Sequence, residues 1–163
     1  MVPSSAHAIL ELVAAYRAAV YAIRLRGGAR VVLRVGTSVP AQLNDSFEVA
    51  GSNADHAGFI TAWNPFSQPV ESRVNRRRQR ELLLQLRSQS RLVLAGAGYG
   101  AGWREPSLAT FGIAPETLDD LARRFRQNAV LTFRRGGTIR LRVYRNEWRG
   151  ALADAAADVD FPA

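Results

Sequence analysis

The sequence contains no cysteine, and it contains no lysine either. Without cysteine the chain can form neither disulfide bonds nor thiolate metal sites, which fits a reducing compartment. No apolar run is long enough to span a bilayer, and the N-terminus has no basic segment followed by an apolar block and a cleavage site. We therefore expect a cytoplasmic protein that does not contact the membrane.

Familiar catalytic and metal-binding patterns are also missing. His7 and His56 are the only histidines, and neither belongs to a His-Glu-x-x-His pattern or to an evident Ser-His-Asp arrangement. No aspartate-rich calcium loop occurs. The sequence therefore indicates no metal and no cofactor, and it leaves open whether the protein is an enzyme. We expect a structural role for His56, which precedes a predicted strand.

The basic residues are numerous, and all of them are arginine. There are 22, and the formal net charge is +8 over 163 residues. This excess favours anionic partners, namely nucleic acid, nucleotides or other phosphates. Genome composition alone could also produce the arginine bias, and the charge says nothing about the oligomeric state. The hydrophobic content of 47% is that of an ordinary globular protein.

The spacing of apolar residues predicts elements in the order α-ββ-β-α-ββ-α-ββ. The expected elements are a helix after Ser4 or Ser5, a hairpin turning at Gly27-Gly28, a strand at 58–63, a helix from Glu71 or Ser72 to about Leu86, a strand at 91–95, an extended segment at 107–111, a helix from Pro115, and a hairpin turning at Gly136-Gly137. We predict an α+β two-layer sandwich, a mainly antiparallel mixed sheet with helices on one face. Residues 1–150 form one domain, and residues 151–163 are a disordered acidic tail.

The strand at 58–63 ends in polar residues that burial alone would not require. Pro65 favours extended geometry at Asn64, so this residue should leave the strand in a fixed direction. In the following helix, Asn75 falls on the same face as Leu82 and Leu86. A buried amide needs hydrogen-bond partners, and Asn64 is the expected neighbour of Asn75.

A glycine-rich stretch at 96–102 contains Gly96, Gly98 and Ala101 in a loose Gly-x-Gly-x-x-Ala pattern. A dinucleotide loop must open a helix, but an extended segment follows here, so we exclude that interpretation. Two possibilities remain: a mobile hairpin connection, or a backbone concavity that binds an anion.

Several motifs together resemble a bacterial family known only as a domain of unknown function. They are Ala-Tyr-Arg at 15–17, Phe-Ile-Thr-Ala-Trp-Asn-Pro at 59–65, Asn75, Gly-x-Gly at 96–98, Trp103 with Glu105-Pro106-Ser107, and Gln127-Asn128-Ala129. The likeness covers about residues 10–144. Arg104 departs from it, since a proline or a small residue is expected there. The resemblance implies a small single-domain bacterial protein and carries no reaction with it.

Polar and aromatic residues at the ends of predicted elements are the candidate site residues. The expected ligand-binding set is Thr61, Trp63, Asn64, Asn75, Gly96, Gly98, Trp103, Gln127 and Asn128, with Tyr99 nearby. Glu105 is the carboxylate among them and the best candidate general acid or base. The first hypothesis is a phosphorylated or nucleotide-like small ligand in a cleft formed by the 61–65 strand end, the 96–105 loop and Asn75.

Two alternatives of other classes remain open, and the amides could also serve only as caps of strands and helices. An uncovered sheet face could bind single-stranded nucleic acid or RNA, because it would present basic and aromatic side chains. Its predicted residues are Arg24, Arg26, Arg30, Arg34, Arg140 and Arg142, with Tyr144. The same face could instead bind an acidic protein, as a non-enzymatic interaction module.

Overall fold

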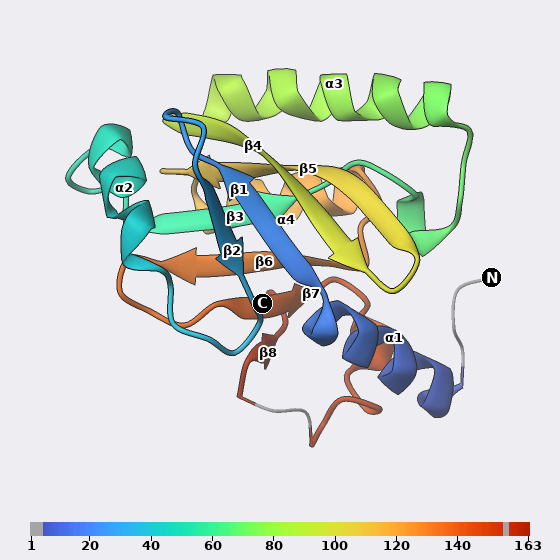
Figure 1. Cartoon of the computed structure of the whole chain (residues 1–163). Helices are drawn as coiled ribbons and strands as arrows, with labels where there is room; N and C mark the ends of the chain where they lie inside the picture. The colour runs from blue at the N-terminus through green and yellow to red at the C-terminus, as the bar shows by residue number, and fades with distance from the viewer. Residues whose placement is uncertain (1–4, 155–156) are drawn as a thin grey trace.

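The computed structural model describes residues 5–154 and 157–163, and within them one sheet holds eight strands in the order β2-β1-β4-β5-β3-β6-β7-β8 (Figure 1). The elements are α1 (Ala6–Ala18), β1 (Val20–Arg24), β2 (Arg30–Leu33), α2 (Asn44–Ala50), β3 (His56–Ile60), α3 (Ser72–Gln89), β4 (Leu92–Gly100), β5 (Trp103–Phe111), α4 (Pro115–Arg124), β6 (Ala129–Arg134), β7 (Arg140–Val143) and β8 (Val159–Asp160). Among these strands, β7 and β8 pair in parallel and the other neighbours pair antiparallel. The predicted α+β class and mainly antiparallel mixed sheet are confirmed.

The sheet curls until the segment after β2 meets the segment before β7. The backbone N–H of Gly36 donates to the carbonyl of Ile139 at 2.8 Å, and the N–H of Val39 donates to the carbonyl of Gly137 at 2.9 Å. The N–H of Ile139 donates back to the carbonyl of Thr37 at 2.9 Å. These bonds partly close the sheet, as in a barrel, so its inner face surrounds a core.

Helices cover both faces, in two different ways. On the outer face, α3 and α4 bury Leu82, Leu86, Leu118 and Leu121 in one hydrophobic cluster. This part matches the expected helices on one face. The helices α1 and α2 instead pack on the inner cluster and lie far apart from each other (Figure 1). A curled sheet has open ends, and the apolar residues at these ends must also be covered. The predicted two-layer sandwich, with helices on one face only, does not include such coverage.

The inner cluster is most aromatic near α2. The ring of Phe47 lies edge-on to that of Phe111 at 5.1 Å and to that of Phe133 at 6.3 Å, measured between centroids. At the opposite end, near α1, the ring of Tyr21 lies edge-on to that of Phe59 at 5.5 Å, and polar side chains join these rings around a small cavity.

The glycine-rich segment is a strand and not a loop. Residues up to Gly100 belong to β4, and only Ala101 and Gly102 form the turn into β5. A Cβ on Gly96 would lie 2.7 Å from the carbonyl oxygen of Ala22 and 2.7 Å from the ring of Phe59. Glycine is thus needed for close approach within the sheet. The expected loop at 96–105 is therefore wrong as secondary structure, because a β-hairpin with a two-residue turn occupies these positions.

The end of the chain is also ordered where the structure describes it. Val159–Asp160 forms β8 beside β7, and Leu152 is buried in the inner cluster. Asp158 lies 3.2 Å from Arg17, and Asp160 lies 3.3 Å from Arg140. The acidic residues that suggested a disordered tail are partners for arginines, which corrects that expectation for the described part of 151–163.

A prediction follows from the end of α4, where Arg126 has a φ of 54° and is exposed. Glycine adopts this left-handed conformation without the steric cost that a Cβ brings. Arg126→Gly should raise the free energy of unfolding in urea by about 0.5–1 kcal/mol. The matched variant Arg126→Ala also loses the arginine side chain, but it keeps a Cβ and therefore the steric cost of the left-handed conformation. Equal stability of the two variants would contradict this explanation.

Candidate functional site

Two asparagines join the end of β3 to the start of α3. Asn75 is 2% exposed, and its Oδ1 accepts a hydrogen bond from the backbone N–H of Asn64 at 2.9 Å. Its Nδ2 donates to Oδ1 of Asn64 at 2.9 Å and to the carbonyl of Val70 at 3.3 Å. The predicted burial of Asn75 beside Asn64 is confirmed. The pair satisfies a buried amide and fixes the path of the chain between the two elements.

Two further side chains of α3 support the segment between β3 and Asn64. The strand ends at Ile60, earlier than predicted, because the N–H of Ala62 donates to Oε1 of Gln79 at 2.9 Å instead of to the sheet. Arg78 donates to the carbonyls of Ala62 at 2.9 Å and Phe125 at 2.6 Å. Helix α3 therefore holds this segment through side chains, including one from an otherwise solvated arginine run.

The backbone after this junction is strained. Asn64, Phe66 and Ser67 have φ angles of 45°, 55° and 59°. The extended geometry expected at Asn64 before proline is therefore wrong, because Asn75 captures both its N–H and its side chain in a left-handed conformation. Such conformations cost of order 1–3 kcal/mol for most non-glycine residues and concentrate at functional sites. Here they bring Ser67 to the wall of a cavity.

The cavity has a volume of about 60 Å³ and lies at the α1 end of the inner face. Seven of the predicted site residues line it: Thr61, Asn64, Gly98, Trp103, Glu105, Gln127 and Asn128. They come from the segment after β3, from both strands of the β4–β5 hairpin and from the segment before β6. The structure thus brings together most of a set that is spread over more than sixty positions of the sequence.

Three predicted residues do not line the cavity. Asn75 lies behind Asn64, and Gly96 packs against Phe59. The carbonyl of Trp63 accepts a hydrogen bond from Nε2 of Gln127 at 3.1 Å, whereas its indole Nε1 is buried without a partner. Asn75 therefore acts on the cavity through Asn64, and Trp63 through Gln127.

Glu105 is held on the cavity wall by Asn64. Nδ2 of Asn64 donates to Oε1 of Glu105 at 2.8 Å. Burial raises the pKa of the Glu105 carboxyl, and this hydrogen bond opposes part of the rise because it favours the ionised form. A carboxyl with a raised pKa in a cavity is a feature common at functional sites.

Glycines make the space in front of Glu105. In the β4–β5 hairpin, Gly98 pairs with Glu105 and Gly100 pairs with Trp103. Paired residues of an antiparallel ladder point to the same face, so glycine leaves room opposite each of these large side chains. A Cβ on Gly98 would lie 3.2 Å from Cζ3 of Trp103. The Gly-x-Gly pattern therefore lies in a paired strand and leaves space for the side chains that line the cavity.

Tyr16, Tyr21 and Ser67 also line the cavity, and sequence reasoning missed them. The hydroxyls of Tyr16 and Ser67 hydrogen-bond at 2.5 Å, and Nδ2 of Asn128 donates to these oxygens at 3.1 and 3.2 Å. The hydroxyl of Tyr21 donates to the carbonyl of Tyr16 at 2.7 Å. Burial raises the pKa of both tyrosines. The Ala-Tyr-Arg motif was the available signal for Tyr16.

One acceptor on the cavity wall has no partner. Oδ1 of Asn128 is buried and accepts no hydrogen bond, although the residue is only 2% exposed. Buried polar atoms are almost always satisfied, by protein or by a bound molecule. None of the described residues that line the cavity is basic. The residues that line the cavity thus include a carboxylate and an amide oxygen without a partner, both of which accept hydrogen bonds.

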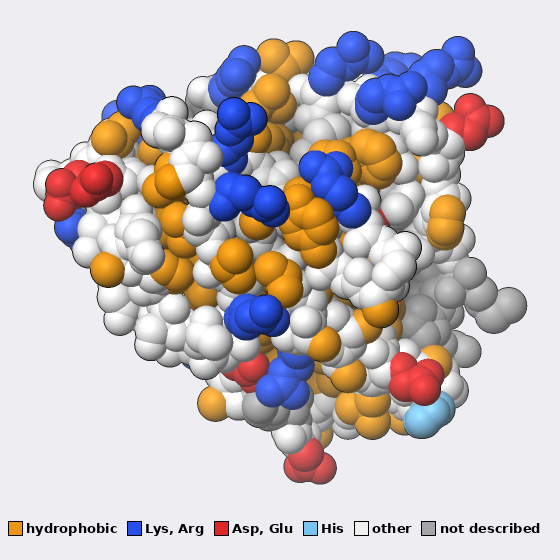
Figure 2. Space-filling model, in the orientation of Figure 1, with side chains coloured by type: hydrophobic (Ala, Val, Ile, Leu, Met, Phe, Trp, Pro, Cys, Tyr) orange, Lys and Arg blue, Asp and Glu red, His pale blue; other side chains and the backbone are white. Residues whose placement is uncertain are grey.

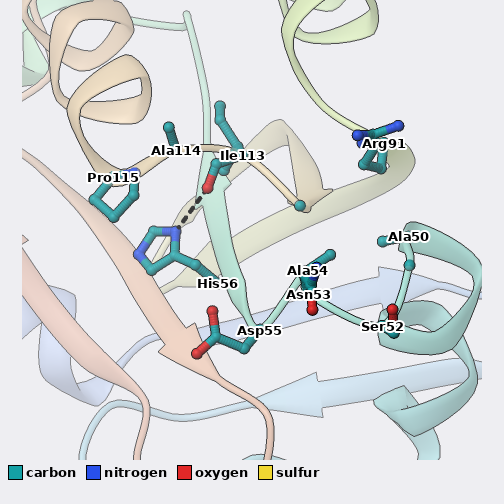
Figure 3. Close-up of a pocket in the computed structure, with 12 residues that line it drawn as sticks. Ala50, Ser52, Asn53, Ala54, Asp55, His56, Arg91, Ile113, Ala114 and Pro115 are labelled. Atoms are coloured by element: carbon teal, nitrogen blue, oxygen red, sulfur yellow. Dashed lines mark hydrogen bonds between the residues drawn. The ribbon is translucent and has the colours of Figure 1, made fainter.

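A larger hollow of about 470 Å³ lies between the loop after α2, Arg91 and the start of α4 (Figure 3). His56 is one of its lining residues, and its ring lies on the side of Pro115, with Nδ1 hydrogen-bonded to the carbonyl of Ile113 at 3.2 Å (Figure 3). Desolvation lowers the pKa of His56. The neighbouring Asp55 is paired with Arg134 at 2.9 Å. These groups already have partners within the chain, so we favour the smaller cavity as the candidate site.

The predicted arginine platform does not form as a single face. In the sheet, four strands separate β1 from β7. Arg142 makes two hydrogen bonds to Asp119 at 2.7 and 2.8 Å, which raises the pKa of the guanidinium, and Arg140 pairs with Asp160. Tyr144 also donates to Asp119, at 2.8 Å. The β7 arginines are thus neutralised, whereas Arg24, Arg26, Arg30 and Arg34 are exposed.

Two general features of the described residues bear on function. No helix among them is long and apolar enough to cross a membrane. No three of their histidine, aspartate or glutamate side chains come together as ligands for a metal ion.

The asparagine pair gives a stability prediction. Asn75→Ala removes the acceptor for the Asn64 N–H and the donor for its Oδ1, leaving buried groups unpaired. We expect a loss of about 1–3 kcal/mol in the free energy of unfolding, measured in urea. The exposed Asn53→Ala should change stability by less than about 0.5 kcal/mol. A loss at Asn75 no greater than that at Asn53 would show that the pair is not structurally important.

Glu105 gives a prediction for pH. Its folded-state pKa is raised, so the folded protein favours the protonated form, and ionisation destabilises it as pH rises through that value. Glu105→Gln cannot ionise and still accepts from Asn64. The variant should therefore unfold at a higher temperature than the natural protein near pH 8, and the difference should vanish below the ordinary pKa of glutamate. Glu48→Gln, at an exposed position, is the control; an unchanged melting difference across pH would contradict this.

Comparison with known proteins gives one match. Neither a search of curated proteins nor one of solved structures found a significant similarity. The model of one family, described as a protein of unknown function (DUF3293), matches residues 60–130. The matched segment runs from the end of β3 to the start of β6 and holds Asn64, Asn75, Glu105 and Asn128, whereas Tyr16 lies outside it. The expected resemblance to a domain family of unknown function is confirmed over that segment.

Proposed function

We propose that the protein binds a small ligand in the cavity at the α1 end of the sheet, through a ligand group that donates hydrogen bonds. The observation that carries the proposal is the buried, unpartnered Oδ1 of Asn128, a residue that lines the same cavity as Glu105. Two buried acceptors in one small space are matched by a donor such as an amine, an amidine or an amide. A binding role is proposed, and no reaction is assigned.

The size of the cavity limits what enters it. A volume of about 60 Å³ holds a few water molecules or one small polar group, whereas sites for whole drug-sized ligands are roughly 300 Å³ or more. A nucleotide-like ligand could therefore insert only an amino-bearing edge. Trp103, Tyr21 and Phe59 would pack on the inserted group, and the remainder would stay outside.

The charge of the cavity argues against the phosphorylated part of the original hypothesis. Glu105 is the ionisable carboxyl on the wall, and the described lining residues include no arginine or histidine. An anion placed beside a buried carboxylate would raise the free energy of both. A cation would lower it and would also favour the ionised form of Glu105. We therefore place a cationic or neutral donor in the cavity.

The proposal is tested with the smallest probes that differ in charge. Methylammonium, acetamide and inorganic phosphate are titrated separately while NMR follows the indole N–H of Trp103 and the amide of Gly98. Two non-hydrogen atoms can supply at most about −3 kcal/mol, so methylammonium should bind with a millimolar Kd. Acetamide should shift the same signals, and phosphate should leave them in place.

Variants assign the binding to the cavity. Glu105→Gln should weaken methylammonium binding at least tenfold and change acetamide binding little, because only the cation needs the negative charge. Glu48→Gln is the matched control on the surface and should bind as the natural protein does. Phosphate shifting these two signals, or neither donor shifting them, would overturn the proposal.

Binding of the cation should also depend on pH. Because methylammonium pairs with the ionised carboxyl, its affinity should rise with pH through the raised pKa of Glu105 and level off above it. Titrations of the natural protein between pH 4 and 8 check this. Glu105→Gln should show a flat profile over the same range, and a pH-independent affinity in the natural protein would place the cation elsewhere.

A further inference from the structure

Most of the arginines fall into two groups that occupy different parts of the molecule. Those of α4, β6 and β7, such as Arg124, Arg134 and Arg142, pair with carboxylates. A second group lies in the β1–β2 hairpin, β5 and α3 and forms no ion pair with a carboxylate among the described residues. Its members, named here the unpaired arginines, are Arg24, Arg26, Arg30 and Arg34 of the β1–β2 hairpin, Arg104 of β5, and Arg73, Arg76, Arg77, Arg80 and Arg87 of α3.

Figure 2 shows the face that carries this second group. Basic side chains gather over β1, β2 and β4 and along α3, whereas acidic side chains lie at the margins of the view (Figure 2). The net charge of +8 is therefore not spread evenly. A surface with one sign of charge attracts a partner of the opposite sign.

This face is also hollowed. A depression of about 420 Å³ lies over β1 and β4, with the small residues Ala22, Ala95 and Ala97 in its lining. Arg24, Arg30, Arg104 and Tyr99 also line it, and no described lining residue is acidic. The volume of the depression falls within the range of small-ligand sites.

Three side chains on it are in contact with one another. The guanidinium carbons of Arg30 and Arg104 are each 5.6 Å from the centroid of the Tyr99 ring. Nη2 of Arg30 also donates to the hydroxyl of Tyr99 at 3.1 Å. Guanidinium and phenol planes are the groups on which unstacked bases pack in single-strand binding proteins.

We propose that this outer face binds single-stranded nucleic acid. A base lies in the depression beside Tyr99, and the unpaired arginines of the hairpin and of α3 contact the phosphates before and after it. A single strand is favoured over a duplex, because a duplex hides the faces of its bases and would leave the depression empty. The site is separate from the cavity: Tyr99 and Arg104 alternate along the strands with Gly98 and Glu105, so they point to opposite faces of the sheet.

The test measures binding of a fluorescent fifteen-nucleotide oligouridine by anisotropy over a range of salt concentrations. Each phosphate contact should contribute about 0.7 to the slope of log affinity against log salt. Arg30→Glu with Arg104→Glu should weaken binding at least tenfold and flatten that slope. Tyr99→Leu should weaken binding about fivefold to a hundredfold and leave the slope unchanged, as expected for a lost stacking contact.

The control carries the same change of charge at paired positions. Arg134→Glu with Arg135→Glu alters arginines that face Asp55 and Glu48. It should reduce affinity much less than the Arg30 and Arg104 pair, and melting curves confirm that each variant is folded. An equal loss in both double variants would mean attraction by net charge only, and would overturn the proposal.

Other probes separate this proposal from its competitors. A duplex of the same length should bind more weakly than the single strand, and polyglutamate should compete poorly. Duplex binding of equal strength, or efficient competition by polyglutamate, would overturn the assignment to single strands. Glu105→Gln should bind oligouridine as the natural protein does. The proposal for the outer face and the proposal for the cavity can therefore be refuted independently of each other.

Discussion

The reciprocal amide pair of Asn64 and Asn75 is the interaction on which the rest of the site depends. Asn75 satisfies both the backbone and the side chain of Asn64, and the Nδ2 that remains on Asn64 reaches Glu105. One buried pair thus sets the start of α3, the strained path through Ser67 and the orientation of the carboxylate. Few alternative partners are available in such a place, which makes the arrangement specific as well as stable.

The β4–β5 hairpin carries the second constraint. Its side chains point alternately to a polar cavity on the inner face and to a basic surface on the outer face. Residues next to each other in the sequence therefore belong to two different sites. Glycine at 98 and 100 gives space on the inner face, while Tyr99 and Arg104 occupy the outer one. The Arg104 that departs from the expected motif therefore lies on the outer surface and leaves Glu105 in its place.

The spacing of apolar residues within one element correctly predicted which side chains are buried. Contacts between elements across the curled sheet could not be predicted from the sequence. The helical spacing between Asn75 and Leu82 was enough to predict that Asn75 is buried. Tyr16 and Ser67 are in contact because the curled sheet places one end of α1 near the segment after β3. No local sequence pattern predicts this curvature. At Asn64 and at 96–100, local rules for proline and glycine predicted the wrong backbone, because side-chain capture and close strand packing outweighed them.

The separation of paired and unpaired arginines has a consequence for the molecule in motion. Asp158 and Asp160 neutralise cations near β7, while α3 and the β1–β2 hairpin keep theirs uncompensated. The positive charge is therefore unevenly distributed over the molecule. Such an asymmetry steers a polyanion toward the arginine face before any contact forms, so the charge pattern would select the orientation of approach for the nucleic acid that we propose.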